Sequence, residues 1–109
     1  MTRSFAVLLI LSASGLATRG DDETIIRDRL DRVRAIHGGT GPWAVAGYRM
    51  GERAMKDLDL PRQSFSLGVV HRCPAKVQYS CMADGLQAAT GASPGKLNLK
   101  VEEAPVEGG

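Results

Sequence analysis

The stretch IHGGTGPWAVAGYR, residues 36–49, decides the fold, because it places a histidine before a glycine-rich turn and then begins a helix. Gly38, Gly39 and Gly41 permit backbone angles that other residues rarely adopt. Pro42 suits the first position of a helix, where its missing N–H would have no partner in any case. The stretch therefore predicts that one helix ends before the glycines and that a second begins at Pro42.

Residues 42–58 show the period of an amphipathic helix, with apolar residues at spacings of three and four. The predicted apolar stripe consists of Trp43, Ala46, Gly47, Met50, Ala54 and Leu58. We expect this to be the most buried helix, with the rest of the chain packed around it. Its free N–H groups face the turn that carries His37, so this turn can hold an anion or place a ligating imidazole. The alternative is a simple connection between two helices.

The first residues of the chain have the pattern of a secretory signal peptide. Arg3 precedes an apolar run at 5–11, and Gly15 and Ala17 suit the −3 and −1 positions of a cleavage site. The run is too short to anchor the mature chain in a membrane. We therefore expect residues 1–17 to be removed on export to the periplasm or the medium. An ordinary buried N-terminal helix is the alternative.

Length and charge limit the function classes. Residues 1–17 contain one basic residue and no acidic one, so export lowers the formal net charge from +2 to +1. No basic stripe is present, so we expect no nucleic-acid partner. A chain of 109 residues forms one small domain whose core is only marginally stable. We place this domain at residues 22–102 and a disordered tail at residues 103–109.

The predicted order of elements is helix, helix, strand, helix, strand, which defines a small α+β domain with its sheet packed against helices. The first helix begins at the acidic residues 21–23 and ends near Ile36. Alternating residues predict strands at 64–71 and at 97–101, and residues 76–79 can extend the sheet.

The third helix is predicted between a serine cap at Ser80 and a terminal glycine at Gly91. Gly85 inside this helix is unfavourable by about 1 kcal/mol relative to alanine, which indicates close packing at that position. The segment GASPGK has one residue too few between its glycines for a phosphate loop. Lys96 and Asn98 are therefore expected to close a turn.

Two segments together resemble the E-subunit family domain of formylmethanofuran dehydrogenase: HGGTGPWAVAGYRMGERAM at 37–55 and QYSCMADGLQAATGASPGKLNL at 78–99. The family pattern opens HGHxCPG followed by GxR, and later has CxxDxxQxxTGCxxGKxNL. The residues that match the first motif are His37, Gly38, Pro42, Gly47 and Arg49. Those that match the second are Cys81, Asp84, Gln87, Thr90, Gly91, Gly95, Lys96, Asn98 and Leu99.

The sequence departs from this pattern at positions where the family has histidine or cysteine residues. Gly39 stands where the family has its second histidine, and Gly41 and Ala92 stand where it has cysteines. The resemblance implies a metal-binding α+β domain, with zinc as the metal. Only His37 and Cys81 remain at matching ligand positions, so the resemblance implies a reduced or lost site.

A structural zinc takes four protein ligands, and a catalytic zinc takes three and a water. Cys73, His71 and Asp84 are candidates to complete the site with His37 and Cys81. Asp84 follows Cys81 by three residues on the same helix, so it is also a candidate to support a ligand by hydrogen bonding or to act as an acid or base.

The resemblance also makes the position of Gly109 informative, because the family domain continues with further strands after the GKxNL segment. We expect a truncated domain whose small sheet exposes an edge, and such an edge invites pairing with another copy or a protein partner. Shortening of a longer ancestral domain would account for an end at Gly109 equally well.

Three functions follow as hypotheses. The first is an exported metal-binding accessory domain, and the second is a metal-free binding or scaffold module. The third is a small thiol or disulfide protein, because Cys73 and Cys81 would enter an oxidising compartment. The enzyme named by the family carries its redox cofactors on other subunits, so whether this chain is an enzyme stays open.

Overall fold

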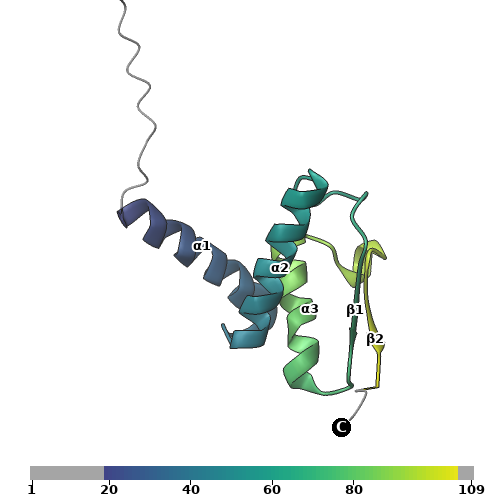
Figure 1. Cartoon of the computed structure of the whole chain (residues 1–109). Helices are drawn as coiled ribbons and strands as arrows, with labels where there is room; N and C mark the ends of the chain where they lie inside the picture. Colours follow the sequence, from purple (N-terminus) through teal and green to yellow (C-terminus); the bar gives the residue numbers. More distant parts are fainter. Residues whose placement is uncertain (1–18, 106–109) are drawn as a thin grey trace, which may run out of the picture.

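The computed structural model describes residues 19–105, which form an α+β domain (Figure 1). The elements in chain order are α1 (Arg19–His37), α2 (Pro42–Leu58), β1 (Val69–Cys73), α3 (Val77–Thr90), a short 3-10 helix (Pro94–Lys96) and β2 (Leu99–Glu103). The predicted class and the order helix, helix, strand, helix, strand are confirmed. The predicted signal peptide at 1–17 lies outside the described residues, as do residues 106–109 of the predicted tail.

The turn between α1 and α2 has the conformation that its glycines predict. Gly38 has a φ of +84°, and its N–H donates to the carbonyl of Arg34 at 2.8 Å. This is the usual way in which a glycine ends a helix. Gly41 is the extended residue before α2, and Pro42 is the first residue of that helix. Both predicted bounds of α2 agree with the structure.

The centre of the domain is α3 rather than α2. Figure 1 shows the strands on one side of α3 and α1 on the other. Within residues 19–105, α3 contacts both other helices and both strands, whereas α1 and α2 contact no strand to a comparable extent. The buried residues of α3 are Ala83, Gly85, Leu86, Ala88, Ala89 and Thr90. The expectation that the chain packs around α2 is therefore wrong.

Two glycines allow α2 and α3 to approach each other backbone to backbone. A Cβ atom placed on Gly47 would lie 2.1 Å from the backbone oxygen of Met82, and one on Gly85 would lie 1.9 Å from the backbone oxygen of Ala44. Non-bonded heavy atoms pack best at about 3.5–4.0 Å, so neither position has room for a side chain. The close packing predicted at Gly85 is confirmed.

The predicted apolar stripe of α2 agrees with its buried face at Gly47, but its large side chains lie outside that face. Trp43, Met50 and Leu58 are 46%, 51% and 58% exposed. The residues of this helix that the structure buries are Ala44, Gly47, Tyr48 and Gly51. Because the backbones of α2 and α3 lie so close together, the shared face takes small residues, and the large apolar side chains fall outside it.

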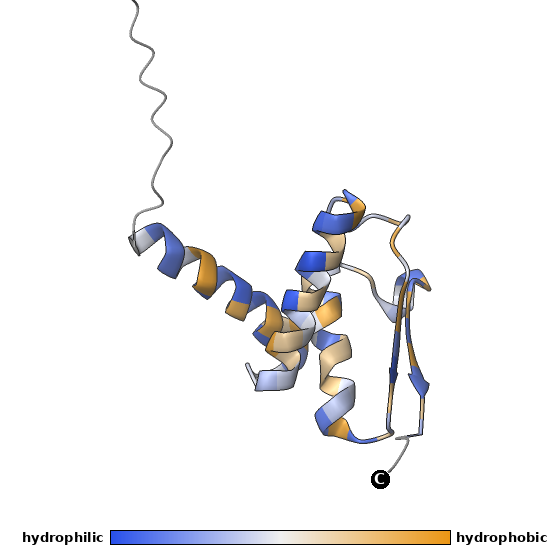
Figure 2. Cartoon of the chain, viewed as in Figure 1, coloured by the Kyte–Doolittle hydropathy of each residue, from blue (hydrophilic) through white to orange (hydrophobic). Residues whose placement is uncertain are grey.

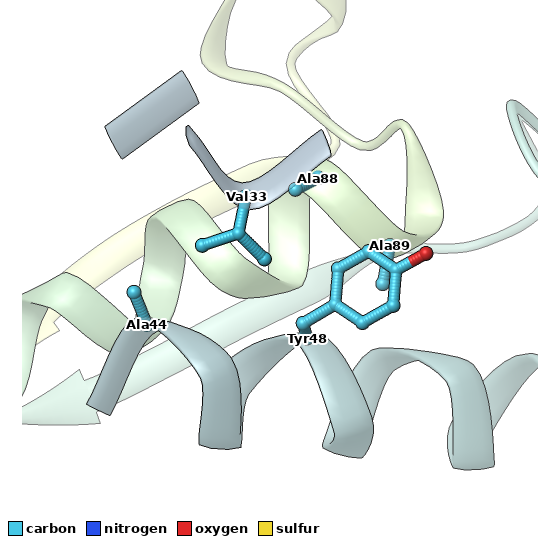
Figure 3. Close-up of a cluster of buried hydrophobic side chains, with 5 residues drawn as sticks. All are labelled: Val33, Ala44, Tyr48, Ala88 and Ala89. Atoms are coloured by element: carbon cyan, nitrogen blue, oxygen red, sulfur yellow. The ribbon is translucent and has the colours of Figure 1, made fainter. Parts of the chain in front are cut away.

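The core joins all three helices through a cluster of five side chains: Val33, Ala44, Tyr48, Ala88 and Ala89 (Figure 3). Three of the five are alanines, so the cluster contains little apolar volume. Among all the described residues, the largest side chains that are less than 2% exposed are those of Val33 and Thr90. Stability therefore depends on how closely the helix backbones approach.

The strands form a parallel pair in which Val69 lies opposite Leu99 and Cys73 lies opposite Glu103. Because α3 connects them, β1, α3 and β2 form a βαβ unit. Both strands begin later than predicted. Phe65 is 76% exposed and Leu97 is 83% exposed, which shows that the predicted strand starts belong to the preceding loops.

The start of α3 also differs from the sequence prediction. The helix begins at Val77 after Lys76, so residues 76–79 do not extend the sheet. Ser80 is not a cap, because it lies inside the helix, where its Oγ donates to the carbonyl of Val77 at 3.3 Å. The end at Gly91 is confirmed by its φ of +75°.

The end of β2 and the free edges of the sheet differ in how they compare with the sequence predictions. Glu103, which was expected to begin the disordered tail, is the last residue of β2. Within residues 19–105 the sheet has two strands, so each strand has one edge without a neighbouring strand. Pairing of this edge with another copy or a protein partner stays a prediction.

No helix in the described part of the chain is long and apolar enough to cross a membrane.

Candidate functional site

A histidine and an aspartate join the end of α1 to the middle of α3. Nδ1 of His37 lies 2.8 Å from Oδ2 of Asp84, and the two side chains are 23% and 42% exposed. A carboxylate can only accept a hydrogen bond, so Nδ1 donates. In the neutral imidazole, the lone pair that can bind a ligand is then on Nε2.

The packing of α1 against α3 explains why these two residues meet. Val33 lies one turn before His37 on α1, and Ala88 lies one turn after Asp84 on α3, so each pair shares a helix face. Val33 and Ala88 belong to the same core cluster. The hydrophobic contact therefore fixes the distance between the helices, and the hydrogen bond forms one turn further toward the glycine turn.

Cys81 lies on the same face of α3 as Asp84. It precedes Asp84 by three residues, a spacing that places both side chains on one helix face. Its thiol is free and the residue is partly exposed. The structure thus brings two of the predicted site residues, His37 and Asp84, into contact, and Cys81 shares a helix face with Asp84 by its spacing.

His71 has a different position and role. Its Nε2 lies 2.9 Å from the backbone oxygen of Tyr79, and because a carbonyl only accepts, Nε2 donates. The bond ties the middle of β1 to the first turn of α3. His71 is therefore engaged in holding the strand to the helix and does not contact the pair of His37 and Asp84.

Cys73 is 6% exposed and ends β1. Its carbonyl accepts a hydrogen bond of 2.9 Å from the backbone N–H of Ala104. Both Cys73 and Cys81 are free thiols, so the disulfide considered above is not formed in the structure.

The donor set does not complete a zinc site of the usual kind. Within the described residues, no group of three or more His, Cys, Asp or Glu side chains could hold a metal ion. Structural zinc sites need four such ligands, and catalytic sites need three. What the chain retains is the His37 imidazole, oriented by Asp84, and the thiol of Cys81 on the same helix face as that aspartate.

Thr90, which belongs to the second family motif, has a structural role at the end of α3. The hydroxyl of Thr90 donates to the carbonyl of Leu86 at 2.7 Å and accepts from the N–H of Ala92 at 3.1 Å. It therefore satisfies two buried backbone groups where the helix stops. Thr90 is 1% exposed.

The residues that follow close the turn between α3 and β2, as predicted. Nζ of Lys96 donates to the carbonyl of Gly91 at 2.8 Å and also to the side chain of Gln63. Oδ1 of Asn98 accepts from the N–H of Ser93 at 2.9 Å. A cation at a helix C-terminus also interacts favourably with the helix dipole.

The loop after α2 also contributes to this end of α3, which was not predicted. Nη2 of Arg62 donates to the carbonyl of Ala88 at 2.9 Å, and the N–H of Gln63 donates to the carbonyl of Thr90 at 2.8 Å. These contacts join residues more than twenty positions apart, so no local pattern indicates them.

The fold and the site together define a small α+β domain built on a βαβ unit, with a His and Asp pair beside a glycine turn. A family model described as FmdE, Molybdenum formylmethanofuran dehydrogenase operon, matches residues 36–107, about two thirds of the chain. The chain therefore belongs to the FmdE family. The predicted resemblance is confirmed, and the match includes His37, Cys81 and Asp84. Searches of curated proteins and of solved structures gave no significant match.

Proposed function

We propose that this protein is an exported accessory domain of the FmdE family that keeps a reduced metal site. His37 and Cys81 are its protein ligands, and Asp84 holds the imidazole. The observation that supports the proposal is the 2.8 Å contact between Nδ1 of His37 and Oδ2 of Asp84. Metal-ligating histidines almost always donate their other ring N–H to a carboxylate, a carbonyl or water.

The donor chemistry favours zinc over harder ions. Imidazole and thiolate suit zinc, whereas magnesium and calcium prefer oxygen ligands. With two protein ligands, the remaining coordination positions fall to water or to a donor from a partner. The site should therefore bind zinc more weakly than a complete structural site, whose apparent binding free energy is about 10–16 kcal/mol.

The second candidate function is a metal-free binding or scaffold module. It is favoured by Gly39, Gly41 and Ala92, which replace family ligands, and by the small donor set within residues 19–105. In this case His37 and Asp84 serve only to hold α1 against α3. The partner surface would be the free edge of the sheet.

Metal analysis of the purified protein separates these two functions. We expect zinc to be retained by the wild type and lost in both His37→Ala and Cys81→Ala. Cys73→Ala is the matched control, because it removes the other thiol from a position outside the site, and it should retain zinc. A wild type that holds no metal after exposure to zinc rejects the metal site and favours the scaffold.

Export has its own test. The proposed cleavage follows Ala17, so the intact mass of protein recovered from the periplasm or the medium should correspond to a chain that begins at Thr18. Recovery of the whole chain from the cytoplasm alone, with residues 1–17 retained, contradicts export.

A further inference from the structure

The N-terminal half of α1 extends beyond the body of the domain (Figure 1). Val33 and His37, which contact α3, both belong to the C-terminal half. Ile26 continues the face of Val33 two turns earlier, yet it is 53% exposed. Figure 2 shows that hydrophobic segments continue along the extended half of this helix.

A groove of about 1360 Å³ lies between α1 and α2. The ion pair between Arg29 and Glu52, 2.9 Å long, crosses from one helix to the other beside it. The lining contains charged residues of both signs, and its apolar side chains include Ile26, Leu30, Val45 and Met50.

The charges of α1 are divided between its two halves. Residues 20–28 contain four acidic residues and one arginine, a net charge of −3, whereas residues 29–37 contain three arginines and one aspartate, a net charge of +2. An antiparallel copy of the same helix would place each acidic half against a basic half. A two-fold axis repeats every such contact, so the attraction occurs twice.

We infer that this groove binds α1 of a second copy of the chain, in a symmetric dimer whose two α1 helices run antiparallel. The dimer would cover Ile26 and Leu30 and would extend a core that is small in the single chain. It also explains why α1 continues past the body of its own domain, because a helical segment without tertiary packing is marginal in water. The proposal concerns a surface separate from His37 and does not depend on metal binding.

Sedimentation velocity of the purified protein across a range of concentrations tests this surface. We expect the wild type to have twice the mass of one chain. Ile26→Asp should be monomeric but still cooperatively folded by circular dichroism, with any loss of helix content confined to the extended half of α1. Val101→Asp is the matched control, because Val101 is 51% exposed on β2, away from the groove. A wild type that is monomeric throughout overturns the proposal. If Val101→Asp dissociates the dimer and Ile26→Asp does not, the interface lies at the sheet and the proposal is also overturned.

A charge exchange tests the antiparallel arrangement without changing the apolar surface. The sign of the charge changes near residue 28, so an antiparallel pair brings Asp22 of one copy near Arg34 of the other. Asp22→Arg should weaken the dimer at least several-fold, and adding Arg34→Asp should restore it. Failure of the double variant to recover dimer overturns the antiparallel arrangement.

Discussion

Nδ1 of His37 and Oδ2 of Asp84 lie 2.8 Å apart, although the two residues are 47 positions apart in the sequence. The contact joins the last residue of α1 to the middle of α3. It ties the His37 imidazole to α3, the helix that also carries Cys81. The fold that allows this contact depends in turn on how closely the three helices pack.

Replacing Gly85 by alanine should destabilise the protein by about 1–3 kcal/mol, because the added Cβ would meet the backbone of Ala44 at 1.9 Å. Gly47→Ala should have a similar effect, because its Cβ would meet the backbone of Met82. In a helix without such contacts the same change would stabilise by about 1 kcal/mol. Urea unfolding measures the difference in free energy of unfolding.

The control for this experiment is Gly39→Ala. A Cβ at Gly39 would have no heavy atom within 4 Å, so this variant should stay within about 0.5 kcal/mol of the wild type. If Gly85→Ala unfolds at the same urea concentration as Gly39→Ala or at a higher one, α2 and α3 do not pack backbone to backbone.

Thr90→Val should destabilise the protein by about 1–3 kcal/mol, although the two side chains have nearly the same shape. The change leaves the N–H of Ala92 without the hydroxyl that accepts from it, in a buried position. Thr24→Val removes an exposed hydroxyl that donates within α1 and should change stability by less than about 0.5 kcal/mol. Equal thermal unfolding of the two variants would show that the end of α3 does not need the threonine.

Lys96→Met should lower the free energy of unfolding by about 1 kcal/mol, because Nζ donates to the carbonyl of Gly91 at the end of α3. The long apolar part of the side chain is kept, so the change tests the ammonium group. Lys100→Met, an exposed position on β2, is the control and should be nearly neutral. An unaffected urea midpoint in Lys96→Met would mean that the turn closes without this cation.

Thiol titration tests the state of the cysteines. After removal of metal with a chelator, we expect one thiol to react rapidly in the native protein and two to react in the unfolded protein. The rapid thiol should be Cys81, because Cys73 is 6% exposed, and Cys81→Ala should abolish the rapid phase. Unfolded, unreduced protein without any titratable thiol would instead demonstrate a disulfide and support the thiol or disulfide hypothesis.

Local signals in the sequence predicted the local parts of this fold. Pro42 and the glycines before it indicated where α2 begins, and Gly91 indicated where α3 ends, because these residues act through their own backbone angles. The predicted start of α3 was wrong. Ser80 has the chemistry of an N-cap, but the helix begins at Val77, three residues before Ser80, and has no side-chain cap.

Hydropathy predicted only part of the buried face of α2. Gly47 was correctly placed in the apolar stripe, but Gly51 is buried outside that stripe, and Trp43 and Met50 are half exposed. The closeness of the two backbones decides which residues fit between them. The same holds for the candidate site. His37 and Asp84 were each candidates from their own surroundings, but their contact depends on packing between α1 and α3, which no periodicity in one sequence contains.

Calorimetric titration with zinc tests the proposed site most directly. We predict that the wild type binds one zinc ion per chain, that Asp84→Asn binds about 10–100-fold more weakly because the imidazole loses its carboxylate partner, and that His37→Ala does not bind. Equal zinc affinity of the wild type, Asp84→Asn and His37→Ala, or no binding by the wild type, would contradict a metal site at this pair.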